Sequence, residues 1–181
     1  IQQRKCAAAY VQERFPPPAD AHAGWAGSPH DRIRIGYFSA NFHDTATANL
    51  IAGVIELHNR DRFEVIAFSF GTPSRDAMRA RLETAFDRFI DVREQSDADI
   101  ARLARTMEID IAVDLKGFTQ DSRTEIFTHR AAPLQVIYLG YPGTTGAHYI
   151  DYLIADPTVI PQDHTDGYSE KIVRLPHSYQ A

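Results

Sequence analysis

Short apolar runs alternate with segments of helical spacing along most of this sequence. The run at 63–70 is almost continuously apolar, whereas Leu50, Val54 and Leu57 recur at helical spacing. The pattern predicts strands over residues 33–38, 63–70, 89–92, 109–113, 134–139, 152–155 and 171–175. It predicts helices over residues 46–58, 75–86, 97–107 and 123–129. Because continuously apolar strands are buried on both faces, we expect a mostly parallel sheet with helices on both faces, a Rossmann-like α/β fold.

The first 31 residues have a different character. A helix is predicted over residues 1–14, with Cys6, Ala9, Tyr10 and Val11 on one face. The prolines at 16–18 end this helix, because proline lacks an N–H group and clashes with the preceding turn. The remainder is typical of a linker that runs over a surface, anchored by Trp25. We therefore divide the chain into an extension, 1–31, and an α/β domain, 32–181.

Composition and charge limit the partners of the chain. Of the 181 residues, 44% are hydrophobic and 24% are charged, as in soluble globular proteins, and no run approaches the roughly 18 apolar residues of a membrane span. The net charge of −5 divides into +2 over the first 35 residues and −7 over the rest. An acidic body without a basic stripe argues against a nucleic-acid partner. We expect neither a nucleic-acid nor a membrane partner.

The beginning of the chain and its cysteine content carry two further expectations. The single cysteine, Cys6, cannot form an internal disulfide, which favours a reducing, cytoplasmic location. The first residue is Ile1 rather than Met, so we expect the chain to be a piece of a longer protein.

Three loops rich in hydrogen-bonding residues each follow a predicted strand, at residues 39–47, 114–119 and 139–146. In parallel sheets, ligands bind outside the carboxyl ends of the strands, so we expect these loops to converge on one site. A helix that begins there would favour an anionic or hydroxyl-rich ligand. The alternative is purely structural: the glycines serve turn geometry, and Thr45 or Thr47 caps a helix.

Other motifs point to structure rather than chemistry. No dinucleotide fingerprint, P-loop or nucleophile elbow occurs, and the eight histidines lack the spacing of a zinc site. Asp97-Ala98-Asp99 is similar to the D-x-D of metal-dependent sugar transferases, but it follows Ser96 at a helix start, where carboxylates are favoured. We interpret it as a cap, and His58 as a partner of its helix C-terminus. His43 lies in the first loop, where a structural and a functional role are both open.

The octapeptide Leu139-Gly140-Tyr141-Pro142-Gly143-Thr144-Thr145-Gly146 closely resembles the L-G-Y-P-G-T-[ST]-G signature of protein O-linked N-acetylglucosamine transferases, the SPINDLY-like family. The match continues in order from about residue 32 to 179. It includes the segments at 35–42, 62–65, 117–119, 150–152, 168–171 and 175–177.

The resemblance implies a two-lobed GT-B glycosyltransferase, inverting, metal-independent and without a cofactor. It implies transfer of N-acetylglucosamine from UDP-N-acetylglucosamine to Ser or Thr hydroxyls of proteins, with tetratricopeptide repeats upstream. The chain then corresponds to the amino-terminal lobe. The carboxyl-terminal lobe, which holds most of the UDP contacts in the family, is absent. We expect these residues alone to be inactive.

The resemblance also implies roles for individual residues. Leu139, Gly140 and Pro142 resemble the residues that line the sugar. Tyr141, Gly143 and Thr144 are assigned to the same wall only because they are adjacent in the sequence. Thr47 resembles a threonine near sugar and acceptor, and Asn41 belongs to the same substrate-binding loop. The important departure is Thr45, where the family pattern has a histidine, proposed as a base or an acceptor-orienting group. Either catalysis does not need that imidazole, or His43 substitutes for it, or the protein is weak or inactive.

Two alternatives stay open. The chain is a non-catalytic protein-binding lobe of a degenerate transferase, or it belongs to a relative that uses a fucose or glucose donor. The residues of this lobe do not distinguish the donor sugars.

Overall fold

The computed structural model describes residues 2–18 and 30–181; the predicted anchor Trp25 lies outside these residues. One seven-stranded sheet has the order β3-β2-β1-β4-β5-β6-β7, and every neighbouring pair of strands is parallel. The strands are β1 (Ile33–Ser39), β2 (Phe63–Ser69), β3 (Arg88–Asp91), β4 (Ile111–Asp114), β5 (Leu134–Ile137), β6 (Tyr152–Ala155) and β7 (Lys171–Arg174). The predicted Rossmann-like sheet is therefore confirmed, and it is entirely parallel.

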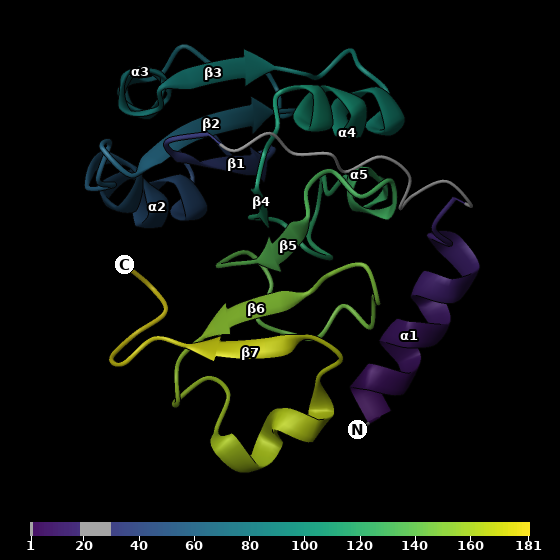
Figure 1. Ribbon diagram of the computed structural model, residues 1–181. Coiled ribbons are helices and arrows are strands. Elements are labelled where there is room, and N and C mark those ends of the chain that lie inside the picture. The colour runs from purple at the N-terminus through teal and green to yellow at the C-terminus, as the bar shows by residue number, and fades with distance from the viewer. Residues whose placement is uncertain (1, 19–29) are drawn as a thin grey trace.

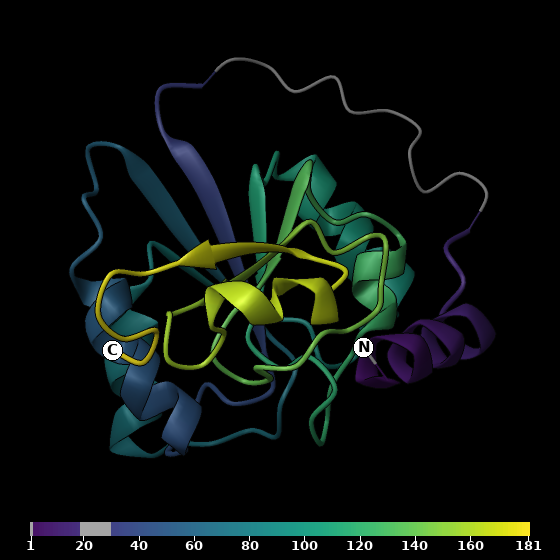
Figure 2. The same cartoon turned by 90° about the horizontal axis from the view of Figure 1, so that it is seen from below.

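Helices cover both faces of the sheet (Figure 1). They are α1 (Gln2–Arg14), α2 (Ala46–Glu56), α3 (Ala77–Ala85), α4 (Asp97–Thr106) and α5 (Glu125–Thr128), with a 3₁₀ helix, η1 (Gln162–Gly167). Buried side chains of α2 and α3 pack on one face, and those of α4 and α5 pack on the other. Helix α1 lies at the side of the molecule near α4 and α5 (Figure 2).

The direction of winding reverses in the middle of the sheet. From β1 the chain runs outward through β2 to β3, and then returns to place β4 on the other side of β1. In doubly wound sheets, the crevice at such a switch point is where ligands bind, outside the carboxyl ends of the strands. The fold therefore directs attention to the loops after β1 and β4.

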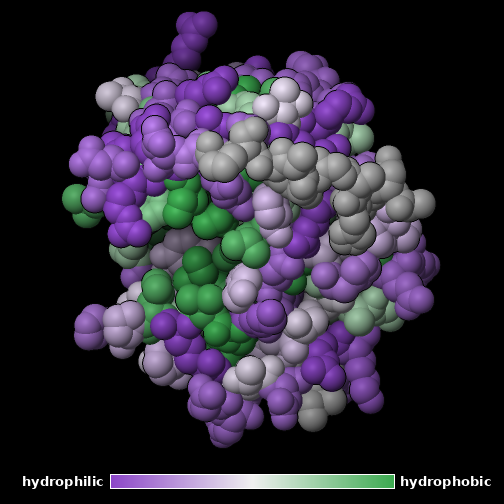
Figure 3. Space-filling model, viewed as in Figure 1, coloured by the Kyte–Doolittle hydropathy of each residue, from purple (hydrophilic) through white to green (hydrophobic). Residues whose placement is uncertain are grey.

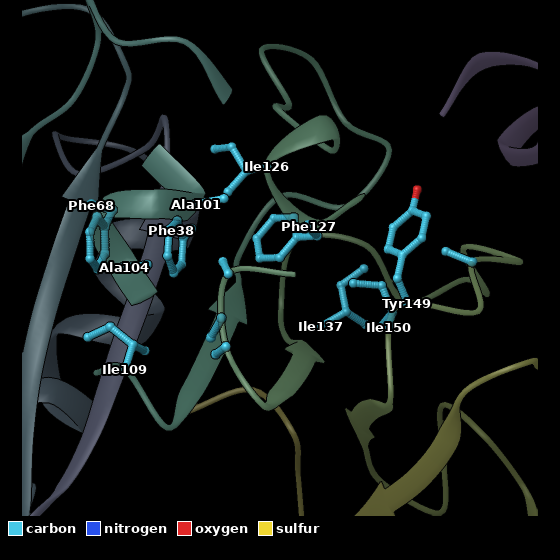
Figure 4. Close-up of a cluster of buried hydrophobic side chains, with 14 of the residues drawn as sticks. Phe38, Phe68, Ala101, Ala104, Ile109, Ile126, Phe127, Ile137, Tyr149 and Ile150 are labelled. Carbon is cyan, nitrogen blue, oxygen red and sulfur yellow. The ribbon is translucent and has the colours of Figure 1, made fainter. Parts of the chain in front are cut away.

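The core explains why the strands are apolar at consecutive positions. Phe38 of β1 stacks on Phe68 of β2 with ring centroids 4.4 Å apart, and Phe127 of α5 meets Phe38 edge-on at 5.4 Å (Figure 4). The adjacent Tyr37 and Ala67 belong to the cluster on the opposite face. Successive side chains point to opposite faces of a strand, so both must be apolar where helices cover both sides.

The sheet is less completely covered at its β6–β7 end. Five consecutive residues are buried in β1 and in β2, whereas buried and part-exposed positions alternate in β6, and β7 has no fully buried residue. Figure 3 shows apolar side chains gathered on the surface between α2 and strands β6 and β7. This face is the most apolar part of the surface in that view.

Two details of the extension and of the C-terminal region differ from prediction. The predicted apolar face of α1 was wrong: Cys6 and Ala9 are exposed, and Tyr10 is 47% exposed, whereas Val11 is 2% exposed. The face that packs inward contains Arg4, Ala7 and Val11, which helical geometry places on one side. The 3₁₀ helix η1 was not predicted, because its polar sequence, residues 162–167, has no apolar period.

Candidate functional site

The three predicted loops meet at the switch point of the sheet. A Cβ atom added to Gly140 would lie 2.1 Å from the carbonyl oxygen of Leu115, and one added to Gly117 would lie 2.5 Å from Cβ of Tyr141. These glycines therefore permit direct contact between the loops after β4 and β5. The loop after β1 joins them through Asn41, whose Oδ1 accepts a hydrogen bond from Nζ of Lys116.

Thr45 ends the first loop by capping α2. Its hydroxyl accepts a hydrogen bond from the N–H of Ala48 (3.2 Å) and donates one to the carbonyl oxygen of Asn41 (3.0 Å). The structural interpretation of Thr45 as a helix cap is therefore confirmed. His43 and Thr47 flank it and are half-buried.

Asp114 shapes the second loop from beneath. Its carboxylate accepts the backbone N–H groups of Lys116 (2.8 Å) and Gly117 (3.1 Å), and Gly117 has a φ of +53° that favours glycine. Burial raises the pKa of Asp114 to about 6, although the two N–H groups partly oppose the increase. Asp114 and Lys116 were not among the residues singled out from the sequence, although the loop that contains them was.

The third loop begins with a strained residue and ends on a buried carboxylate. Leu139 has a φ of +63°, in the left-handed region that a residue with a Cβ rarely adopts. Further along, Oε2 of Glu170 accepts the hydroxyl of Thr144 (2.7 Å), and Oε1 accepts the N–H of Thr145 (2.7 Å) together with its hydroxyl. Glu170 is itself buried, so it anchors the end of the loop to β7.

The predicted wall residues differ in what they present to solvent. Leu139, Gly143 and Thr144 are buried, Gly140 and Tyr141 are half-buried, and Pro142 is exposed. The hydroxyl of Thr144 is committed to Glu170, and also lies 3.1 Å from the hydroxyl of Ser169. Their contacts with a substrate stay predictions.

Helix α1 packs directly against the second and third loops. Nε2 of Gln3 donates to the hydroxyl of Tyr141 (3.3 Å), and the ring of Tyr10 meets that of Phe118 edge-on at 5.5 Å. A Cβ atom on Gly146 would lie 2.3 Å from the backbone nitrogen of Ala8. The helix therefore forms part of the support of the site.

Features outside this edge have structural explanations. The Oγ atom of Ser96 accepts the N–H of Asp99 (3.2 Å), and Oδ1 of Asp97 accepts Nε of Arg123 (2.5 Å), so the predicted cap is confirmed. His58 lies 2.6 Å from the carbonyl oxygen of Val54, near the C-terminus of α2. An apolar groove of about 330 Å³ lies between α1 and residues 146–148, beside the contact of Ala8 with Gly146.

Neither a metal site nor a membrane span is found in the described part of the chain. Within residues 2–18 and 30–181, no group of three or more His, Cys, Asp or Glu side chains could hold a metal ion. Over the same residues, no helix is both long and apolar enough to cross a bilayer.

The parallel sheet with converging loops at its switch point defines one lobe of the GT-B type. Residues 18–181 match the family description "Glycosyl transferase family 41", and the chain belongs to this family. The resemblance drawn from the octapeptide is thereby confirmed.

Relatives of known name agree with this assignment. The chain is 39% identical over 175 residues to the probable UDP-N-acetylglucosamine–peptide N-acetylglucosaminyltransferase SEC of Arabidopsis thaliana, covering 93% of this chain and 18% of that protein. It is 32% identical over 149 residues to the UDP-N-acetylglucosamine–peptide N-acetylglucosaminyltransferase of Caenorhabditis elegans, covering 82% and 13%. A solved mutant of the Thermobaculum terrenum O-GlcNAc transferase superposes with a TM-score of 0.86 at 33% identity, covering 98% and 34%. The chain thus spans about a third or less of each.

Proposed function

We propose that the chain is the amino-terminal catalytic lobe of an inverting, metal-independent glycosyltransferase. In this proposal the enzyme moves N-acetylglucosamine from UDP-N-acetylglucosamine to Ser or Thr hydroxyls of proteins. The observation that carries the proposal is the convergence of the signature loop, residues 139–146, with the loops after β1 and β4 at the switch point. The names of the relatives from Arabidopsis and Caenorhabditis support the same donor and a peptide acceptor.

In this proposal, the lobe supplies one wall of a cleft. The chain covers 34% of the solved O-GlcNAc transferase, which leaves room in such a protein for a second lobe that binds most of the UDP. The nucleotide sugar would then lie between the two lobes. The residues of this chain alone would neither bind UDP tightly nor transfer sugar, and calorimetry with UDP is the measurement that checks this.

The chemistry proposed is an in-line displacement at the anomeric carbon. The acceptor hydroxyl attacks, the bond to the diphosphate breaks with its electron pair leaving on the phosphate oxygen, and the hydroxyl proton passes to the leaving diphosphate or to water. Both hydrogen bonds of the Thr45 hydroxyl are made within its own loop and helix, so this residue contributes geometry rather than proton transfer. General-base assistance contributes about 10²–10⁴-fold, so positioning and electrostatic stabilisation can sustain catalysis without an imidazole at this position.

A radiolabelled-donor assay on the full-length protein tests this function. UDP-N-acetylglucosamine, UDP-glucose and GDP-fucose are each offered with protein acceptors, with and without EDTA. We expect label in Ser or Thr residues from UDP-N-acetylglucosamine, at a rate that EDTA leaves unchanged, and a product of inverted anomeric configuration by NMR. Transfer only from another donor would correct the substrate. No transfer from any donor would favour the alternative, a non-catalytic protein-binding lobe, for which the replacement of the family histidine by Thr45 is the motivating observation.

A further inference from the structure

Lys116 is a buried cation at the centre of the candidate site. The chain has three lysines, of which Lys5 and Lys171 are exposed, whereas Lys116 is 7% exposed. A buried charge is unfavourable unless it is paired and hydrogen-bonded. Within the part of the chain that the structure describes, Lys116 forms no ion pair, and its ammonium donates to the neutral amide oxygen of Asn41.

The nearest carboxylates do not neutralise this charge by direct contact. Asp114 uses its two oxygens to accept the backbone N–H groups of Lys116 and Gly117. Burial lowers the pKa of Lys116, and the attraction of Asp121 and Asp114 through space opposes this only in part. An ammonium held under these conditions favours a further oxygen partner.

The position of Lys116 brings it next to the signature loop. A Cβ atom on Gly140 would lie 3.1 Å from Cα of Lys116, so the third loop rests on the backbone of this residue. On the other side, the ammonium reaches Asn41 in the first loop. An ammonium group has three protons to donate, and Asn41 accepts one of them. Among residues 2–18 and 30–181 no second acceptor binds this ammonium, so two of its protons remain for a ligand.

We propose that Lys116 is a substrate-binding residue whose ammonium donates hydrogen bonds to oxygen atoms of the nucleotide-sugar donor. This proposal rests on the proposed function. A donor of this class offers several hydroxyl and phosphate oxygens, and a hydrogen bond to a charged group contributes more affinity than a neutral one. In the proposed function the signature loop lines the sugar, and this loop rests on Lys116, so the expected partner is the donor rather than the peptide acceptor.

Two substitutions in the full-length protein separate the charge from the contact with Asn41. Lys116→Met removes the ammonium at similar length, and Lys116→Gln keeps a donor for Asn41 without the charge. The exposed Lys5→Met is the matched control. Binding of UDP-N-acetylglucosamine is measured by calorimetry, KM for donor and acceptor by transfer kinetics, and folding by thermal unfolding.

We expect both Lys116 variants to bind the donor about 10–100-fold more weakly, with acceptor KM and unfolding temperature close to those of the wild type and of Lys5→Met. Wild-type affinity in Lys116→Met, or in Lys116→Gln alone, would overturn the proposal. So would a loss of activity in Lys116→Met accompanied by an unchanged donor affinity. If the wild type binds the donor without transferring sugar, the proposed function fails while the calorimetry still decides the role of Lys116. If it neither binds nor transfers, both proposals are wrong.

Discussion

Thr45, at the position where the resemblance implies a histidine, is a fixed structural element of the first loop. Its hydroxyl caps α2 by accepting the N–H of Ala48, and it closes the first loop by donating to Asn41. An imidazole at this position would have to leave the helix N-terminus uncapped or cap it less well. The threonine therefore stabilises the loop, but it cannot supply the proton transfer of the histidine that the resemblance implies.

Thr45→His is expected to raise sugar transfer per folded molecule, or at least to leave it unchanged. The same substitution removes the cap and is expected to lower the free energy of unfolding by about 1 kcal/mol. Urea unfolding and the radiolabelled-donor assay measure the two effects separately, with Thr45→Ser as the control that keeps the cap. A sharp fall in turnover of a variant that is still folded would mean that Thr45 does not mark the position of a lost base.

Asp114 makes the stability of this lobe depend on pH in an unusual direction. Burial raises the pKa of Asp114 from 3.8 to about 6, so between these values the folded state binds the proton more tightly than the unfolded chain. The contribution of this residue to the free energy of unfolding is therefore greatest below pH 4. It falls as the pH rises to 6, by on the order of 3 kcal/mol.

Asp114→Asn is expected to abolish this particular fall. Urea unfolding of wild type and variant at pH 4, 5, 6 and 7 gives the difference curve. Asp156→Asn is the control of opposite sign: backbone N–H groups, that of Tyr179 foremost, lower the pKa of Asp156, so its contribution is present above the ordinary pKa and lost in acid. If the free energies of unfolding of wild type and Asp114→Asn had the same pH dependence, the fall could not be assigned to Asp114.

The signature loop is held at both ends by features of different kinds. At its start, Leu139 occupies the left-handed region, which is unfavourable by about 1–3 kcal/mol and persists only where the surroundings enforce it. At its end, the carboxylate of Glu170 accepts from Thr144 and Thr145. Glu170 therefore stabilises the loop conformation from its position just before β7.

Glu170→Ala is expected to lower the free energy of unfolding by about 2–4 kcal/mol, because it leaves buried donors of Thr144 and Thr145 without their acceptor. Urea unfolding provides the measurement. The exposed Glu125→Ala is the control, expected within about 0.5 kcal/mol of wild type. A loss for Glu170→Ala no larger than that of the control would show that water replaces the carboxylate.

The elements that could be predicted from sequence are those whose burial imposes a pattern. Strand β2 is an almost continuous apolar run because helices cover both faces of the sheet. The three loops could be placed because parallel strands end at one edge. The face of α1 could not be predicted, since its alanines fit several orientations and tertiary contacts, among them that of Ala8 with Gly146, select one. The role of Glu170 could not be predicted either. The segment that contains Glu170 belongs to the family match, but the loop that it binds lies 25 residues away along the chain. Its role depends on tertiary contact.

At the scale of the whole molecule, the site is assembled from distant parts of the chain. The first loop follows β1, the second follows β4, and α1 reaches the second and third loops from the beginning of the described chain. An apolar face also lies between α2 and strands β6 and β7 (Figure 3).

Removal of residues 1–14 is expected to destabilise the lobe and to loosen the loops. Val11 is 2% exposed and belongs to the core cluster of α4 and α5, so its loss leaves apolar surface open. We expect a lower unfolding temperature and faster chymotryptic cleavage after Phe118 and Tyr141, followed by mass spectrometry. The exposed substitution Cys6→Ser is the control. Unchanged cleavage in the truncated chain would show that the loops do not depend on the helix.

The contact between α1 and Gly146 has a practical consequence for where this lobe can be cut. The family match begins at residue 18, after the helix has ended. A recombinant lobe that starts at residue 18 would lack Ala8, whose backbone packs against Gly146. It would also lack Gln3, whose side chain donates a hydrogen bond to the hydroxyl of Tyr141. In chimeras that exchange lobes between transferases, helix α1 therefore has to be transferred together with the sheet.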